Sequence, residues 1–384
     1  MNRGIPRDRQ ERGEAMGASR AIRVGTPVEA LETPVLVIDI DAMERNLARM
    51  MSILAGTGLS LRPHLKTAKS PALAQMMIRA GAVGVCCAKL SEAEVMANAG
   101  ITDILLTSEV AGVGKFERLV GLAGWVPNFK AVVDNAHAIR AIAGLSRAQG
   151  VTTKLLIEVD VNTNRSGVVS AQEALALADL IAETEGVELL GVHGYAGHAQ
   201  IRPMETREPV NEAAMTTLEE AVELLREHNH SIPIVTGGGT GTSELDAARG
   251  VLNELQAGSF LLMDTAYRDA GVPFELALRC RSTIISRPAP DRAVCDAGQK
   301  TMSHDAGPPE VEGRPGVTYR RGSDEHGSLI VDPALLDRPL EVGDVISLVP
   351  SHICTTVNLH DVFVGARNNV VEAVWPIEAR GHIW

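Results

Sequence analysis

The sequence predicts an α/β protein made of a (β/α)8 barrel and a smaller C-terminal β domain. Apolar runs typical of strands alternate with helical stretches about eight times before residue 265, at intervals of roughly 25–35 residues, as in a barrel of this type. Beyond residue 265 the runs become short and β-branched and are separated by Pro and Gly, which indicates a β domain. We therefore expect a disordered extension over residues 1–22, the barrel over 33–265, and a β domain over 266–384 that also includes a strand near 23–32.

The composition is that of an ordinary globular protein, with 45% hydrophobic and 22% charged residues. Aromatic residues make up only 3% and the net charge is −12, which argues against a nucleic-acid partner. No apolar run approaches the ~18 residues of a membrane span, so no membrane partner is expected. Five cysteines without a regular spacing, and an N-terminus without the apolar core of a secretion signal, predict reduced thiols and a cytoplasmic protein.

The first elements can be read from their apolar periodicity. Residues 33–39 form a strand-like run, and Asp41 opens a helix with Met43, Leu47 and Met50 on one face. Further along the chain, Ser91 is expected to cap a helix. The remaining strands of the first unit are expected at 59–63, 84–87, 103–107, 129–134, 154–160, 189–195, 234–236 and 253–258, and those of the second at 283–285, 292–294, 328–331 and 345–349.

Polar residues follow several of the expected barrel strands at the point where each strand ends. In a (β/α)8 barrel these strand ends meet at one mouth, which is where such folds carry their chemistry. The residues concerned are Lys66, Glu109, Asp134, Asp160, Arg165, Tyr195 and Thr236.

Lys66 is the candidate nucleophile. It lies in a basic turn with Arg62, His64 and Lys69, and neighbouring cations favour the neutral, nucleophilic form of an amine. The alternative is a solvated surface charge. Lys69 is a competing candidate, although a charge on a helix face explains it better.

A glycine-rich loop over residues 236–242 follows a strand and offers backbone N–H groups to a phosphate. It lacks the GxGxxG spacing of a dinucleotide loop and the lysine of an ATP-binding loop, so a tight turn is the remaining alternative. Ser259, after the next strand, could add a hydroxyl donor. Arg165 would supply a fixed cation facing a cofactor ring, or else pair with Asp160 or Glu158.

An amine nucleophile, a fixed cation and a phosphate cradle are what a protein must supply to hold pyridoxal phosphate (PLP) as a Schiff base. A second candidate site lies near the C-terminus. His352 and Cys354 are two residues apart, so on a strand both would face the same side, where they could bind Zn²⁺ or a similar ion. The alternative is a buried thiol beside a hydrogen-bonded imidazole. The polar clusters at 296–300 and 324–327 line the same cleft or form turns.

These motifs, in this order, resemble the fold type III PLP enzymes of the D-threonine aldolase and D-serine dehydratase group, which are relatives of the alanine racemase barrel. The resemblance runs from about Thr33 to the C-terminus. It is carried by residues 62–66, 84–94, 158–168, 236–241, 254–259 and 324–327 and by the His352/Cys354 pair.

The resemblance implies a role for each candidate residue. Lys66 would be the Schiff-base lysine, and His352 and Cys354 would be ligands of a divalent metal ion, Zn, Mn or Mg, that holds the β-hydroxyl of the substrate. It also implies a homodimer in which the β domain of one subunit helps to close the site of the other. The cofactor contacts would be Lys66, His64, Arg165, Tyr195, Thr236, Gly238, Gly239, Thr240 and Ser259.

Two departures from the aldolase pattern affect these expectations. The aldolases commonly have an Asp where this chain has Cys354, and the softer thiolate favours Zn²⁺ over Mg²⁺ or Mn²⁺. The aldolase pattern Tyr-His-Gly, whose His is the presumed base, reads Tyr195-Ala196-Gly197 here, so His198 is the candidate to replace that base.

The activity that the resemblance implies is a lyase reaction. A PLP- and metal-dependent enzyme of this group would cleave the Cα–Cβ bond of a β-hydroxy-D-amino acid, a small-molecule substrate, into glycine and an aldehyde. The alternative is a dehydratase that converts D-serine or D-3-hydroxyaspartate into a 2-oxoacid and ammonia. An amino-acid racemase or a non-catalytic PLP-binding protein has less use for the metal pair.

Overall fold

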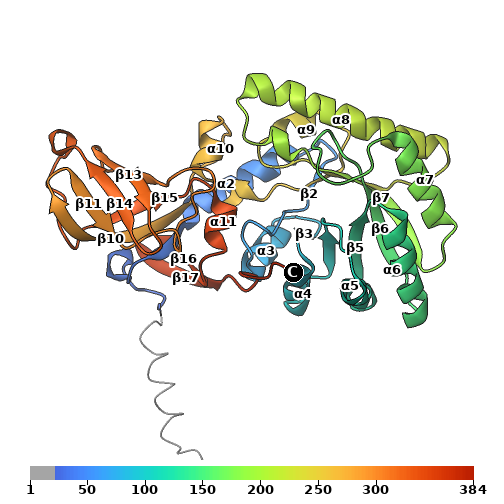
Figure 1. The fold of residues 1–384 in the computed structure, drawn as a ribbon, viewed down its shortest axis with the longest axis horizontal. Coiled ribbons are helices and arrows are strands. Elements are labelled where there is room, and N and C mark those ends of the chain that lie inside the picture. Colours follow the sequence, from blue (N-terminus) through green and yellow to red (C-terminus); the bar gives the residue numbers. More distant parts are fainter. Residues whose placement is uncertain (1–21) are drawn as a thin grey trace, which may run out of the picture.

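The computed structural model describes residues 22–384, which form a barrel and a β domain side by side (Figure 1). The extension expected over residues 1–22 lies outside the described residues, apart from Ile22. Within residues 22–384, no helix combines the length and the apolar character needed to cross a membrane.

The barrel is built from eight parallel strands in the order β2-β9-β8-β7-β6-β5-β4-β3. The backbone that follows β2 closes the circle, because Leu65 N donates to Cys86 O (2.8 Å) and Cys86 N donates to Pro63 O (2.9 Å). The (β/α)8 prediction is therefore confirmed. The strands are β2 (Ser60–Leu61), β3 (Val85–Cys87), β4 (Asp103–Leu106), β5 (Asn128–Val133), β6 (Thr153–Glu158), β7 (Val187–Gly194), β8 (Ile234–Gly237) and β9 (Glu254–Leu255).

The helices cover the outside of this sheet (Figure 1). The first begins after Asp39, whose side chain caps it by accepting from Ala42 N, and it buries the expected face of Met43, Leu47 and Met50. Ser91 is not a cap as predicted; it lies inside a helix and its hydroxyl donates to Trp384 O (2.7 Å). The helices are α2 (Ile40–Leu54), α3 (Pro71–Arg79), α4 (Leu90–Asn98), α5 (Val113–Trp125), α6 (Ala136–Gln149), α7 (Ala171–Ala182), α8 (Met204–Glu227) and α9 (Ser243–Arg249).

The second sheet has the order β13-β14-β11-β10-β1-β16-β17, with β12 and β15 paired beside β10. Two short helices, α10 (Thr265–Asp269) and α11 (Ile353–Val357), lie between the sheet and the barrel mouth (Figure 1). The strands are β1 (Val35–Asp39), β10 (Leu278–Ala289), β11 (Arg292–Cys295), β12 (Glu310–Glu312), β13 (Val317–Gly322), β14 (Gly327–Val331), β15 (Val345–Val349), β16 (Val362–Arg367) and β17 (Val370–Pro376).

One strand belongs to a different unit than the sequence predicted. β1, expected within the barrel, pairs antiparallel with β10 and parallel with β16 in the second sheet. A short buried apolar run has the same composition in either sheet, so its sequence does not distinguish them. The strand expected near 23–32 is reduced to an isolated bridge between Pro27 and Val370, followed by a 3-10 turn over Val28–Ala30.

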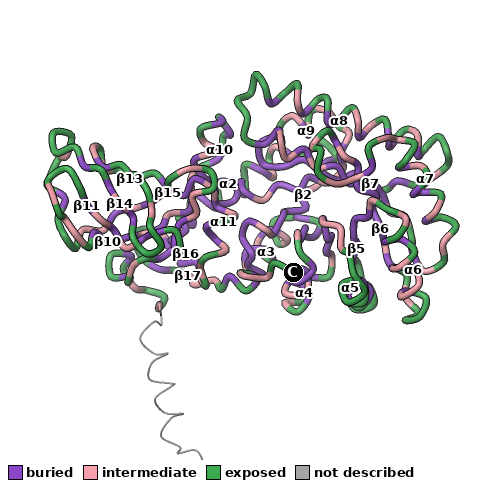
Figure 2. Tube along the Cα trace, in the orientation of Figure 1, coloured by how far each residue is buried: buried purple, intermediate pink, exposed green. Residues whose placement is uncertain are grey.

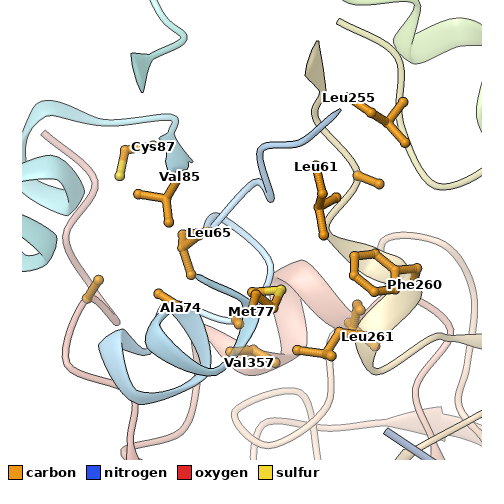
Figure 3. Close-up of a cluster of buried hydrophobic side chains, with 14 of the residues drawn as sticks. Leu61, Leu65, Ala74, Met77, Val85, Cys87, Leu255, Phe260, Leu261 and Val357 are labelled. Atoms are coloured by element: carbon orange, nitrogen blue, oxygen red, sulfur yellow. The ribbon is translucent and has the colours of Figure 1, made fainter. Parts of the chain in front are cut away.

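The hydrophobic core is continuous from the barrel into the β domain. Buried segments run along the barrel strands and into the second sheet (Figure 2). Met77 of α3, Leu261 after β9 and Val357 of α11 belong to one cluster of buried side chains (Figure 3). This shared packing fixes α11 relative to the strand ends of the barrel.

Charged groups also lie inside the barrel. Arg62, whose side chain is 2% exposed, donates to both oxygens of Glu254 (2.7 and 2.8 Å) and to Asp103 (2.5 Å). Lys130 adds a further bond to Asp103 at 2.8 Å. Arg62, Asp103, Lys130 and Glu254, the barrel charge cluster, are thus mutually paired, as buried charges need to be.

Candidate active site

A cavity of about 380 Å³ lies at the barrel mouth, between the strand ends and the β domain. A smaller cavity of about 90 Å³ adjoins it and shares His64, Lys66, Tyr195 and Gln256 with it. The predicted site residues that line the larger cavity are His64, Lys66, Tyr195, Gly239, Thr240, Ser259, His352 and Cys354.

Lys66 lies in the loop after β2 and its amine is held against an aromatic face. Its Nζ is 4.8 Å from the ring centroid of Tyr195, and the guanidinium carbon of Arg165 is 5.8 Å from the same centroid. The competing Lys69 is buried in an ion pair with Glu92, so its amine is already used. The structure therefore favours Lys66 as the nucleophile.

Arg165 lines the smaller cavity, and its guanidinium lies 3.8 Å from Glu158. Both alternatives from the sequence are thus met in part: a cation near the predicted ring site, and an acidic partner. Asp160, the other acidic residue considered, instead accepts from Thr163 N (2.7 Å) and helps to fix the loop that carries Arg165.

His64 is held as a neutral imidazole. Thr107 donates its hydroxyl hydrogen to Cys87 O, so it accepts from His64 Nε2 (3.0 Å), while His64 Nδ1 accepts from Lys66 N (3.4 Å). Burial, reinforced by the positive charge of Lys66, lowers the pKa of His64 well below its usual range. The imidazole therefore positions the backbone of Lys66 without adding a charge.

The glycine loop over residues 236–242 forms one wall of the larger cavity, which we call the glycine wall. Gly238 has φ +63°, which favours glycine, and a Cβ on Gly239 would come within 2.5 Å of Gln200 Oε1. Thr240 Oγ1 accepts from Phe260 N (3.0 Å), so its own hydrogen is free to point elsewhere. Within residues 22–384, the N–H groups of Thr240 and Ser259 donate to no backbone carbonyl. Free donors on a bare backbone fit the phosphate of PLP.

Gln200, which the sequence did not flag, holds this loop from the side. Its Oε1 accepts from Gly241 N (2.9 Å), and its Nε2 donates to Ala196 O (3.2 Å) and to Thr242 Oγ1 (3.1 Å). The side chain is 3% exposed and lines the larger cavity. Its position directly after a 3-10 turn, five residues beyond the end of a predicted strand, gave no periodic signal.

Thr236 and Gly238 do not line either cavity. The Thr236 hydroxyl instead accepts from Gln256 Nε2 (3.0 Å), and Gln256 Oε1 accepts from His193 Nε2 (3.2 Å). Thr236 therefore affects the cavity only by holding Gln256, which lines it, and Gly238 affects it only through the backbone conformation of the glycine loop.

His193 is a titratable residue of the smaller cavity that the sequence analysis missed. Burial alone would lower its pKa, but the adjoining Glu158 carboxylate outweighs this effect, and the pKa is raised. Both ring nitrogens have acceptors, Glu158 and Gln256, which is consistent with the imidazolium. The inward parity of His193 in β7 and of Gln256 after β9 could have identified both residues.

His352 and Cys354 lie together at the larger cavity, but not on a strand as predicted. His352 is the N-cap residue of α11, and Cys354 lies in the first turn of that helix. His352 Nδ1 is 2.6 Å from Asp305 Oδ2, and Cys354 Sγ is 3.3 Å from Thr67 Oγ1. The prediction placed the two side chains on one side through the alternation of a strand. In the structure the first turn of α11 brings them to the same cavity instead.

The chemistry of this pair fits a divalent metal ion. Burial alone would raise the pKa of the Cys354 thiol, but the adjacent His352 outweighs it and the pKa is lowered, which favours the thiolate that binds metals. Asp305 on the second nitrogen of His352 is the outer partner that a metal-bound imidazole usually has. Within residues 22–384 no third protein ligand joins them, which leaves further positions for substrate or water.

Asp264, also missed by the sequence analysis, connects the barrel to the metal pair. One oxygen of this buried carboxylate accepts from Tyr267 N at the start of α10 (3.0 Å), and the other accepts from Ile353 N at the start of α11 (3.0 Å). One side chain therefore fixes the start of α10 and the start of α11, which carries the His352/Cys354 pair, relative to each other.

His198, predicted as the base, does not line either cavity. It lies in a 3-10 turn, η3 (Gly197–Ala199), and burial together with Arg202 lowers its pKa. Its neighbours Gly197 and Gln200 are the residues of this turn that face the larger cavity. The local turn geometry, which the sequence does not reveal, directs His198 away.

Comparison with known proteins agrees with this geometry. Residues 38–266 match the family described as "Alanine racemase, N-terminal domain", and residues 277–366 match a family of serine dehydratase domains. The chain is 40% identical to a D-threonine aldolase from Arthrobacter sp. over 93% of this chain and 95% of that one. It is 36% identical to a 3-hydroxy-D-aspartate aldolase from Paracoccus denitrificans (strain Pd 1222), over 93% and 94%.

Among solved structures, the chain is similar to a D-threonine aldolase from Filomicrobium marinum, with a TM-score of 0.91 and 38% identity over 94% of this chain and 100% of that one. The relatives therefore match this chain over nearly its full length, including the segments that carry Lys66, the glycine wall and the His352/Cys354 pair. The chain belongs to the alanine racemase-like, fold type III PLP family, and within it to the group that contains the D-threonine aldolases.

Proposed function

We propose that this protein is a PLP- and divalent-metal-dependent lyase that cleaves the Cα–Cβ bond of β-hydroxy-D-amino acids into glycine and an aldehyde. The observation that carries the proposal is that Lys66, the glycine wall and the His352/Cys354 pair face one cavity. The names of the two aldolase relatives support this reaction.

Each group in the cavity has a defined task in this proposal. Lys66 holds the cofactor through Nζ, Thr240 and Ser259 bind its phosphate, and Arg165 faces its ring. When bound, PLP withdraws electrons from the substrate Cα. His352 and Cys354 would hold the metal ion, which would make a neighbouring β-hydroxyl of the substrate more acidic.

Lys66 would have a second task whenever its Nζ is not bonded to the cofactor. Its Nζ is then a free amine within the cavity, held near the ring of Tyr195. From that position it can transfer a proton to or from the substrate Cα. Return of a proton to Cα completes the release of glycine.

A dehydratase is the second candidate function, and Cys354 is the observation that favours it. A thiolate metal ligand is typical of the dehydratase branch that the sequence resembles, and residues 277–366 match serine dehydratase domains. In that reaction the β-hydroxyl leaves and Lys66 takes the α-proton. The two reactions use the same residues and differ in which bond is broken.

Product analysis separates the two functions. Purified protein, loaded with PLP and Zn²⁺ or Mn²⁺, is incubated with D-threonine and with D-serine. We expect acetaldehyde and glycine in equal amounts from D-threonine, and loss of this activity on treatment with a chelator. A 2-oxoacid and ammonia as sole products would exclude the aldolase reaction.

The assignment of Lys66 is tested by its absorbance. We expect Lys66→Ala to lose the band at about 420 nm that reports the covalent lysine–cofactor bond, together with all activity. Lys300→Ala is the control, because Lys300 is 65% exposed and pairs only with Glu325 on the surface. Retention of the band in Lys66→Ala would assign the bond to another amine.

We also propose that the protein is a cytoplasmic homodimer. All five cysteines are free thiols, and four of them are buried, which suits a reducing compartment. The dimer rests on the resemblance to the fold type III enzymes, in which the β domain of one subunit helps to close the site of the other.

A further inference from the structure

Arg207, the fourth residue of α8, is a buried cation that the proposed reaction has not yet used. It is 1% exposed and lines neither cavity. A group that is enclosed this completely keeps the same surroundings when a second subunit covers the barrel mouth. The environment of Arg207 is therefore set by a single chain.

The guanidinium of Arg207 holds three backbone segments together. Nε and Nη2 both donate to Arg202 O (2.9 and 2.6 Å), Nη1 donates to Gly241 O (3.0 Å), and Nη2 also donates to Ala270 O. Arg202 lies between the η3 turn and α8, Gly241 belongs to the glycine wall, and Ala270 ends α10. Within the described part of the chain, all hydrogen-bond partners of this cation are therefore neutral carbonyl groups.

Carbonyl groups satisfy the N–H donors of Arg207 but do not neutralise its charge. Burial lowers the pKa of Arg207, and Tyr267 and Glu244 oppose this effect only in part. Tyr267 stays neutral because burial raises its own pKa. The Glu244 side chain is 48% exposed and is already paired with Arg49 (3.3 Å). Arg207 thus forms no ion pair within residues 22–384.

Arg62 shows what a comparable charge has elsewhere in this chain. Its side chain is 2% exposed, and it is paired with Asp103 and Glu254 in the barrel charge cluster. A buried charge without an anion costs free energy, because it has lost its hydration and gained no partner of opposite sign. An anion that completes the environment of Arg207 would therefore have to be a bound one.

One contact of Arg207 places its charge behind the expected phosphate site. Gly241 directly follows Thr240, which lines the larger cavity. Gly241 is held at both of its polar groups, since Gln200 Oε1 accepts from its N–H (2.9 Å) and Arg207 Nη1 donates to its oxygen (3.0 Å). The backbone beside Thr240 is thus fixed by one neutral side chain and one cation.

A second contact reaches the same end of the cavity through α10. Arg207 binds the end of this helix at Ala270 O. The helix also contains Tyr267, which lines the larger cavity together with Ser259. Two separate segments therefore connect Arg207 to the part of the cavity where the phosphate is expected.

We propose that Arg207 supplies the buried positive charge that offsets the phosphate charge of the cofactor, from behind the glycine wall and without touching it. It is a positioning residue that acts through the backbone of Gly241 and through the field of its charge. Opposite charges that are both withdrawn from water attract each other more strongly than in solvent, and connected hydrogen bonds polarise one another. The inference rests on the proposed function, because the phosphate is that of PLP.

The first experiment compares the affinity of the apoprotein for PLP with its affinity for pyridoxal, which has the aldehyde but no phosphate. Absorbance at about 420 nm reports the bond of either compound to Lys66. In Arg207→Gln, which keeps an N–H donor group but is neutral, the preference for PLP over pyridoxal should fall at least about tenfold. A purely structural role would weaken both compounds alike, and an unchanged preference would overturn the inference.

Two further variants accompany Arg207→Gln. Arg207→Lys keeps the charge with fewer donors and should hold the preference within about threefold of the wild type. Arg226→Met is the matched control, because it removes an exposed arginine from the same helix and should leave the preference unchanged. Should Arg207→Gln not fold, Arg207→Lys still decides, since loss of the preference in a variant that keeps the charge would overturn the inference.

Inorganic phosphate tests the same charge without the cofactor ring. We expect phosphate to raise the Tm of the wild-type apoprotein above its value in chloride of equal ionic strength, because it binds the folded state. This rise should be at least about halved in Arg207→Gln, since a neutral side chain attracts the anion less. An equal rise in both proteins would overturn the inference.

Failure of the inference can be told apart from failure of the proposed function. If wild-type apoprotein shows the absorbance band with neither PLP nor pyridoxal, the proposed function is removed, and the inference with it. If the wild type binds both compounds and Arg207→Gln keeps the full preference for PLP, only the inference fails.

Discussion

Asp246 of α9 lies behind the glycine wall, fully buried, and supports it from below. Its carboxylate accepts from Thr242 Oγ1 (2.6 Å) and from Asn211 Nδ2 (2.9 Å). Burial raises the pKa of Asp246 to about 6, although these hydrogen bonds oppose the shift. The folded protein therefore holds this proton more tightly than the unfolded chain does.

This shift predicts a pH-dependent contribution to stability. A raised pKa means that the contribution is fully present below the unfolded pKa of about 3.8 and is lost as the pH rises through about 6. Relative to Asp246→Asn, which does not titrate, the wild-type free energy of unfolding should fall by on the order of 2–3 kcal/mol between about pH 4 and pH 7.

Urea denaturation of both proteins across this pH range measures the difference. Comparing the two proteins cancels the titration of the other groups, which they share. A difference that stays constant with pH would show that Asp246 does not titrate in this range.

At the residue scale, the sequence identified groups whose chemistry is tied to a motif. Lys66, Arg165, Thr240 and Ser259 each follow a strand, and barrel topology brings strand ends together. His198 as the base stays a prediction. It does not line either cavity, because a single 3-10 turn decides which of its side chains face the larger one. Asp264 was missed because its role depends on two N–H groups far apart in the chain.

Among the elements, the glycine wall has the strictest geometric requirement. At Gly238, φ is +63°, and a Cβ would collide with the Asp246 carboxylate and come within 2.8 Å of Leu255 Cδ1. Gly250, which ends α9, has φ +73° but no atom within 4 Å of its Cβ position. Gly238 and Gly250 therefore both have a left-handed backbone conformation, but only Gly238 lacks room for a Cβ.

This pair of glycines gives a matched test of the wall. Gly250→Ala should cost about 1 kcal/mol of stability and leave cofactor affinity unchanged, because only backbone strain is added. Gly238→Ala should cost several times more and weaken PLP binding at least about tenfold, since the wall must shift. Titration of the apoprotein with PLP, together with thermal unfolding, measures both effects. Equal behaviour of the two variants would contradict the role of Gly238.

Two elements show where sequence periodicity stops being informative. His352 and Cys354 were expected on a strand, whereas they occupy the N-terminus of the five-residue helix α11. A segment this short contains less than two turns, so neither period can be recognised. β1 was placed in the wrong sheet because its apolar run is compatible with both.

Stability of the whole molecule depends on the barrel charge cluster. Arg62–Glu254 and Arg45–Glu275 are both bidentate pairs with the same two distances, 2.7 and 2.8 Å. They differ in burial: the Arg62 side chain is 2% exposed and the Arg45 side chain is 57% exposed. The geometry is matched and the surroundings are not.

Removing the guanidinium should therefore have unequal effects. Arg62→Met leaves Glu254 and Asp103 without their main partner inside the barrel and should destabilise the protein by about 3–5 kcal/mol. Arg45→Met should cost at most about 1 kcal/mol. Chemical denaturation of both variants measures the loss in free energy of unfolding. Similar losses would show that burial inside the barrel does not make the Arg62 ion pair more important for stability than the exposed Arg45 pair.

The position of β1 affects how the chain can be divided. Because this strand lies between β10 and β16, the sheet near the C-terminus has at its centre a segment from the other end of the chain. The barrel strands, β2 to β9, are consecutive and leave the ribosome before β10, whereas the second sheet, which begins with β1, cannot be completed until β17 has been synthesised. A fragment beginning at residue 266 would have two separated half-sheets with exposed edges, so co-expression with residues 22–265 should be required to recover a folded β domain.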